Sequence, residues 1–158
     1  MVEPTIIANC GEGETGKSDS IKRAYEKLCK VADSDPFPLR DPDNFSGDVC
    51  SVVTINNVKV GIVSLGDVIT TIKDCIDELI RHECQIILAS GRNSYKAICL
   101  LKSYYNKGYR LWRTSNARIY EYIDKDNPRV APKGMLKRFN ENWATEIANL
   151  IEAWCYAG

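Results

Sequence analysis

Eight residues near the start of the chain have the types and spacing to bind phosphate groups. They fit the pattern G-x-x-x-x-G-K-[ST] in full and read Gly11, Glu12, Gly13, Glu14, Thr15, Gly16, Lys17 and Ser18. Glycines let a backbone curl so that several N–H groups point into one concavity, which attracts anions. A helix that begins at the same point directs the positive end of its dipole there. We therefore expect this octapeptide to hold a polyphosphate.

Four side chains would add specific chemistry to this loop. Lys17 would reach the β- and γ-phosphates as a point charge, and the Ser18 hydroxyl would bind Mg²⁺. Asp67 follows an apolar run, where a carboxylate binds the metal or orients a metal-bound water, although an N-cap of the next helix is the alternative. Arg92 follows another apolar run and would offset charge on the γ-phosphate, with a surface salt bridge as the alternative. These four are the candidate catalytic and metal-binding residues.

The octapeptide and its strand–loop–helix setting resemble the P-loop NTPase superfamily. The order of helix, long loop, β-hairpin, helix and strand also resembles the small GTPases. The resemblance implies binding of a nucleoside triphosphate with Mg²⁺. Asp67 lacks the following glycine of the GTPase Asp-x-x-Gly pattern, and the guanine-reading Asn-Lys-x-Asp is absent from the sequence. We therefore expect ATP by elimination, and GTP stays open as the alternative.

The same glycines also fit G-x-G-x-x-G, the turn that binds dinucleotides. That interpretation needs a second parallel strand after the helix, ending in an acidic residue about 20 positions further on. Asp33 and Asp35 lie at this distance, but helical periodicity continues to residue 31 and leaves no room for a strand. It also leaves Lys17 and Ser18 without a role. We therefore favour the triphosphate interpretation.

Several further residues are weaker candidates for the same site. Glu14 would pair with Arg40 from the loop after the first helix, with two solvated charges as the alternative. Cys10 would be either a reactive thiol or a small residue at a strand end. The remaining candidates are basic residues that would approach the phosphates, as a finger or a mobile lid, or lie on a solvated surface: Arg113, Arg129, Lys133, Lys137 and Arg138.

Strands and helices must alternate along the chain to position these residues. Runs rich in β-formers predict strands over residues 5–9, 49–55, 58–64, 85–89, 109–113 and 119–123. Apolar residues at helical spacing predict helices over 17–31, 68–80 and 97–105, and a last helix over 136–154. Asn56 and Asn57 predict a hairpin turn, residues 33–48 a long loop, residues 90–92 a turn, and Gly108 a helix stop.

This alternation predicts an α/β fold of three layers, similar to P-loop NTPases. We expect a mostly parallel sheet with one antiparallel hairpin strand at its edge, in a single domain over residues 1–158. Trp143 and Trp154 on the last helix indicate core packing or a partner surface.

Composition narrows the classes of partner. The 158 residues include 21 Lys plus Arg and 21 Asp plus Glu, so the formal charge is zero. This argues against nucleic acid or an anionic membrane as a partner, and no apolar run approaches the roughly 18 residues of a membrane span. The N-terminus lacks signal-peptide features, and the seven scattered cysteines predict a reducing, cytoplasmic setting. The single histidine, His82, argues against a zinc site.

We therefore expect a small protein that binds Mg²⁺ with a nucleoside triphosphate and hydrolyses it slowly, or with help from a protein partner. One alternative is a small-molecule kinase that uses the same loop. Another is a non-catalytic nucleotide-binding or interaction module. Phosphate release without an acceptor separates the first interpretation from the other two.

Overall fold

The computed structural model describes residues 2–11, 17–41, 47–64, 69–92, 95–114, 120–122, 128–130 and 133–158. At the ends of several elements it describes the backbone only. Among the described residues, none of the helices combines the length and apolar character needed to cross a bilayer.

A mixed six-stranded sheet forms the centre of the molecule, with the strand order β2-β3-β4-β5-β1-β6. Its strands are β1 (Thr5–Gly11), β2 (Phe37–Pro38), β3 (Cys50–Ile55), β4 (Val58–Val63), β5 (Ile86–Arg92) and β6 (Arg110–Thr114). The pairs β4·β5, β5·β1 and β1·β6 are parallel, and β3 is antiparallel to both of its neighbours. The predicted α/β class and mostly parallel sheet are therefore confirmed.

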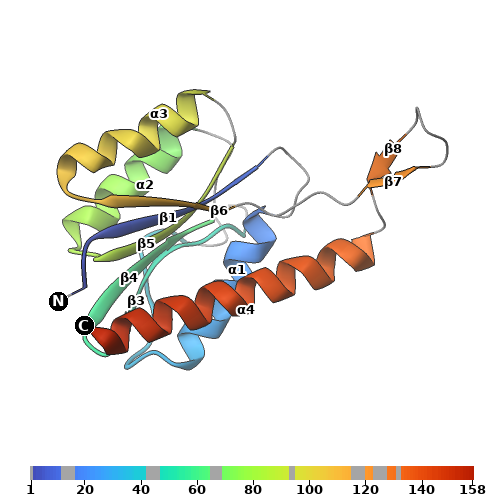
Figure 1. Cartoon of the computed structure of the whole chain (residues 1–158). Coiled ribbons are helices and arrows are strands. Elements are labelled where there is room, and N and C mark those ends of the chain that lie inside the picture. The colour runs from blue at the N-terminus through green and yellow to red at the C-terminus, as the bar shows by residue number, and fades with distance from the viewer. Residues whose placement is uncertain are drawn as a thin grey trace.

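Helices cover both faces of this sheet (Figure 1). One face carries α1 (Lys17–Lys30) and α4 (Lys133–Ala157), and the other carries α2 (Ile69–Arg81) and α3 (Tyr95–Ser103). Because side chains alternate along a strand, each strand contributes to two cores. Ile7, Ile62 and Leu88 pack toward α1 and α4. Their neighbours on the opposite face pack in the second core, around Ile76 and Leu79 of α2.

The predicted hairpin between β3 and β4 is confirmed, with Asn56 and Asn57 at its turn. Their φ values are 49° and 62°, the left-handed conformation that two-residue turns of this kind require. The Asp33 carboxylate accepts hydrogen bonds from the backbone N–H groups of Asn56 (3.1 Å) and Asn57 (2.9 Å). The segment after α1 therefore fixes the tip of the hairpin.

The sequence predicted the hairpin's antiparallel strand at the edge of the sheet, and this prediction is wrong. The short strand β2 lies outside β3, inside the segment predicted to be a loop. Pro38 is compatible with this place because an edge strand needs no N–H donor on its outer side. The backbone N–H of Leu39 continues the pairing with the Cys50 carbonyl at 2.8 Å.

The predicted turn at residues 90–92 is also wrong, because these residues extend β5. Ser90, Gly91 and Arg92 pair with Asn9, Cys10 and Gly11 of a β1 that is itself longer than predicted. The additional residues of β1 and those of β5 pair with each other, so each strand supplies the backbone partners for the extension of the other. The predicted stop at Gly108 is confirmed: this residue has a φ of 86° and follows a 3₁₀ helix over Tyr104–Lys107.

A small second sheet lies between β6 and α4 in the chain. It pairs β7 (Tyr120–Tyr122) with β8 (Pro128–Val130), and Figure 1 shows it standing away from the main body. The predicted strand at 119–123 therefore exists, but outside the main sheet. β8 lies between the predicted strand at 119–123 and the predicted helix at 136–154, where the sequence predicted no strand.

The cysteines are free thiols in both cores and on the surface. Cys99 is exposed and Cys29 is half-buried. The other five are buried: Cys10, Cys50, Cys75, Cys84 and Cys155. The interpretation of most cysteines as small buried residues is confirmed.

Candidate functional site

The carboxyl ends of β1 and β5 lie side by side, and the helices that follow these two strands lie on opposite faces of the sheet. β1 leads into α1 on one face, whereas the adjacent parallel strand β5 leads into α3 on the other face. Helices that leave neighbouring strands on opposite faces open a crevice between the strand ends, where open α/β sheets bind ligands. This crevice is the candidate functional site.

The octapeptide connects the two elements at this crevice. Gly11 is the last residue of β1 and pairs with Arg92, the last residue of β5, and Lys17 is the first residue of α1. The backbone therefore brings Gly11, Lys17 and Arg92 to one edge of the sheet. Residues 12–16 and Asp67 lie outside the described residues, as do the side chains of Lys17, Ser18 and Arg92.

A row of polar side chains crosses four strands just below this edge. Asn9 of β1 is level with Ser90 of β5 and with Thr114 of β6, and Ser64 directly follows β4 at the same level. Asn9 and Ser64 have no exposed surface, and Ser90 is 2% exposed. The residues two positions earlier pack toward α1 and α4, so the polar row faces these helices. Buried polar groups are costly without partners, so their bonding is informative.

One half of the row is joined to the entry of β3. The Ser90 hydroxyl donates to the Ser64 carbonyl at 2.5 Å. The Ser64 hydroxyl accepts from the Val49 N–H at 2.7 Å and donates to Asp48 Oδ1 at 2.9 Å. The same carboxylate oxygen lies 3.3 Å from Nζ of Lys22, which follows Ser18 by one turn of α1. This network attaches the hairpin to the beginning of α1.

The other half of the row is joined to α4. The Trp143 Nε1–H donates to Thr114 Oγ1 at 3.0 Å, and Thr114 Oγ1 lies 3.4 Å from Asn9 Oδ1. The three groups connect α4, β6 and β1 in one line.

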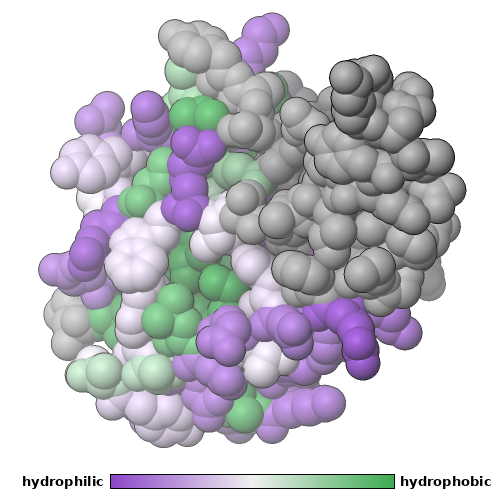
Figure 2. Space-filling view, turned by 45° about the vertical axis from the view of Figure 1, so that its right-hand side comes forward, coloured by the Kyte–Doolittle hydropathy of each residue, from purple (hydrophilic) through white to green (hydrophobic). Residues whose placement is uncertain are grey.

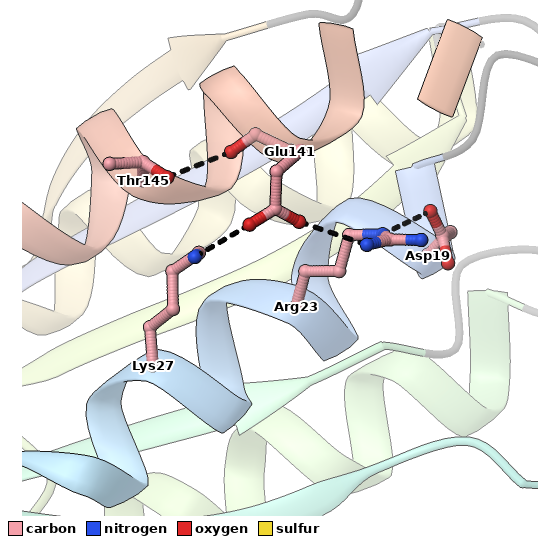
Figure 3. A network of polar contacts seen from close by, with 5 residues as sticks. All are labelled: Asp19, Arg23, Lys27, Glu141 and Thr145. Carbon is pink, nitrogen blue, oxygen red and sulfur yellow. Dashed lines mark hydrogen bonds and ion pairs between the residues drawn. The ribbon is translucent and has the colours of Figure 1, made fainter. Parts of the chain in front are cut away.

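Helix α4 also binds the middle and the last turn of α1 through charged side chains (Figure 3). The Glu141 carboxylate binds Arg23 at 2.9 Å and Lys27 at 2.6 Å, and Arg23 also binds Asp19 at 2.8 Å. Hydrogen bonds from Lys27 and then from Arg23 lower the pKa of Glu141. The same carboxylates raise the pKa of Arg23, so the network favours the charged forms.

The described surface beside the site has no broad apolar face in the view drawn. Figure 2 shows a narrow strip of hydrophobic residues with hydrophilic ones to its left and below it. In the described part of the chain, no group of three or more His, Cys, Asp or Glu residues is placed to hold a metal ion.

The structure separates some predicted site residues from the crevice. Arg40 binds Glu78 of α2 at 2.5 Å, and its hypothetical partner Glu14 lies outside the described residues. β2 explains this contact, because its pairing with β3 brings Arg40 to the side of α2. Lys137 and Arg138 are exposed on α4, and the side chains of Arg129 and Lys133 lie outside the described residues. Arg113 is exposed on β6, and Cys10 is 2% exposed.

Sequence reasoning missed the polar row, Asp48 and the role of Trp143. A signal for the row does exist, because three of the parallel strands end an apolar run in a polar residue (TIIAN, VGIVS and IILAS), and β6 (RLWRT) also ends in one. Aligning these ends would have suggested one polar level at the carboxyl edge.

Comparison with known proteins adds no relative to this picture. No family model, curated protein or solved structure matches the chain.

Proposed function

We propose that this protein binds a nucleoside triphosphate together with Mg²⁺ at the octapeptide, with ATP preferred to GTP, and hydrolyses it slowly. The observation that carries the proposal is the position of the G-x-x-x-x-G-K-S sequence. It connects the end of β1 to the first residue of α1, at the crevice between β1 and β5. A glycine-rich loop between a parallel strand and a helix N-terminus is the arrangement that binds phosphates through backbone N–H groups.

Different groups at the site would bind different parts of the ligand. The backbone N–H groups of residues 11–18 would surround the phosphates, and Lys17 would neutralise charge on the β- and γ-phosphates. Ser18 and Asp67 would hold Mg²⁺. This cation usually takes one or two protein ligands and completes its shell with phosphate oxygens and water, so it does not need a cage of acidic residues. When bound, the metal would neutralise charge developing on the transferred phosphoryl group.

Slow turnover follows from the groups that surround the crevice. The described polar row carries buried hydroxyls and an amide, which are poor bases near neutral pH. Asp48 is joined to Lys22 and Ser64, which favours a structural role for its carboxylate. We therefore expect hydrolysis to be slow without a partner that supplies a base or an arginine.

Thermal unfolding with and without nucleotide tests the proposal. Mg-ATP at one hundred times its Kd should stabilise the protein by about 2.7 kcal/mol, and GTP, ADP and NAD should stabilise it less at the same concentration. Lys17→Ala should abolish the shift with Mg-ATP. Lys30→Ala is the matched control, since this exposed lysine lies at the other end of α1.

Two outcomes would contradict the proposal. If Lys17→Ala responds to Mg-ATP as the wild type does, the octapeptide is not the site. If no nucleotide shifts the unfolding temperature of the wild type, the proposed binding is wrong. Phosphate release in the absence of any acceptor would separate hydrolysis from kinase chemistry.

A further inference from the structure

We infer that Trp143, Thr114 and Asn9 form a positioning chain that couples nucleotide binding at the octapeptide to helix α4. The inference rests on the proposed function and concerns the residues that hold the loop in its binding shape. None of the three belongs to the octapeptide, so their contribution can be tested separately from that of Lys17.

The direction of the hydrogen bonds in this chain is fixed by chemistry. An indole N–H can only donate, so Thr114 Oγ1 accepts the bond from Trp143 at 3.0 Å. The single hydroxyl proton of Thr114 is then available for Asn9 Oδ1, 3.4 Å away. The order of the donors orients the Asn9 carboxamide, with its oxygen toward β6.

Asn9 is well placed to transmit this orientation to the loop. It is fully buried and lies two residues before Gly11, where the octapeptide begins. Its backbone pairs on both sides, with Ser90 of β5 and Thr114 of β6. A displacement of Asn9 would therefore displace the end of β1, and with it the start of the loop.

Helix α4 contacts both elements that the octapeptide joins. Trp143 reaches β1 through Thr114 and Asn9, whereas Glu141, two residues earlier, binds Arg23 and Lys27 of α1. The strand before the loop and the helix after it are thus both attached to one short part of α4, and Figure 3 shows the attachment to α1. We therefore expect a change in loop shape on nucleotide binding to alter these contacts.

Such coupling is reciprocal, which gives it two measurable consequences. Nucleotide binding should change the environment of the Trp143 indole, and breaking the chain should weaken nucleotide binding. A purely structural role for the three residues would lower stability but leave the affinity of the folded protein unchanged.

The first experiment compares Thr114→Val with Thr114→Ser. Valine keeps the shape of threonine without the hydroxyl, and serine keeps the hydroxyl. We expect Thr114→Val to raise the Kd for Mg-ATP about fivefold, the factor typical of one hydrogen bond, and Thr114→Ser to stay within about twofold of the wild type. The Kd is measured by titration at a temperature where each variant is folded. If Thr114→Val does not fold, Trp143→Phe breaks the chain at its other end by removing the indole N–H donor, and it is expected to give the same increase.

The second experiment uses tryptophan emission. Mg-ATP should change the emission of the wild type, and Trp143→Phe should abolish this change. Trp154→Phe is the matched control and should retain it, because Trp154 packs edge-on against Trp112, with ring centroids 4.7 Å apart, eleven residues further along α4.

The outcomes separate this inference from the proposed function. If the wild type binds Mg-ATP but the two Thr114 variants have equal affinity, or the emission change survives in Trp143→Phe, the positioning chain is wrong and the nucleotide site stands. If the wild type binds no nucleotide, the proposed function fails and this inference fails with it.

Discussion

At the carboxyl edge, the two faces of the central sheet carry opposite kinds of side chain although they share the same strands. Toward α1 and α4 the strands present Asn9, Ser64 and Ser90, all buried. One position away, toward α2 and α3, the same strands present small apolar residues: Ala8, Cys10, Val63 and Ala89. The polar residues are therefore a property of one face rather than of the strand ends in general.

This difference separates the framework of the molecule from its candidate site. The α2/α3 face carries a mainly apolar core that also holds Tyr104 and Tyr109, and burial there raises the pKa of the Cys84 thiol from its ordinary value of 9.0 to about 12. The α1/α4 face buries hydroxyl and amide groups, which a framework alone does not require. Those groups lie on the face that packs against α1, the helix that begins where the octapeptide ends. We expect mutations on the first face to change stability, and mutations of the polar row to change ligand binding as well.

The largest expected effect is on the apolar face. Leu79→Ala should lower the free energy of unfolding by about 3 kcal/mol, because Leu79 has no exposed surface and the substitution leaves a cavity. Urea denaturation measures this loss. The affinity of the folded variant for Mg-ATP should equal that of the wild type, and a severalfold loss of affinity would show that the two faces are not separable.

A matched pair of smaller changes compares the faces directly. Ser90→Ala removes the hydrogen bond to the Ser64 carbonyl, and Ala89→Ser adds a hydroxyl to the apolar face one residue away. Each should lower the free energy of unfolding by about 1–2 kcal/mol. Only Ser90→Ala should also weaken Mg-ATP binding, as measured by titration. Equal affinities of the two variants for Mg-ATP would show that the polar row does not contribute to ligand binding.

The smallest effect is expected at the charged contact between α1 and α4. Glu141→Gln should lower the free energy of unfolding by at most about 1 kcal/mol, because Glu141, Arg23 and Lys27 are partly exposed and solvent screens them. Molar salt should reduce the difference from the wild type.

The pH dependence of this contact has a definite sign. The pKa of Glu141 is lowered in the folded protein from its ordinary value of 4.5, so the unfolded chain takes up the proton first. The stabilisation is therefore present above pH 4.5 and is lost as the pH falls through the lowered pKa. Wild type and Glu141→Gln should converge in acid, and a difference that grows on acidification would contradict the assignment.

Most of the fold could be predicted because local patterns determine it. Helical periodicity located α1 and α2, and Asn56 and Asn57 identified the hairpin turn from two residues. The errors occurred where pairing between distant segments decides the structure. Residues 90–92 look like a turn in isolation, but β1 offers them a parallel partner. β2 has only two residues, one of them proline, so its sequence carries almost no strand signal.

The candidate site could be predicted only in part, for the same reason. The octapeptide is contiguous, so its spacing alone was enough to predict it as a phosphate-binding loop. The polar row combines single residues from four strands, and its members become neighbours only through the strand register. The contact of Trp143 with Thr114 bridges 29 positions in the chain and has no local signal.

Gly61 of β4 faces helix α2, and a Cβ atom added there would lie 2.9 Å from Cδ2 of Leu79. The Leu79 side chain of α2 therefore packs directly against the main chain of β4 at Gly61. A leucine from one element occupies the volume that a side chain on the other would need, and the two positions complement each other in size. The absence of a Cβ atom at Gly61 therefore makes room for the Leu79 side chain, and a larger residue at this position would force Leu79 to shift.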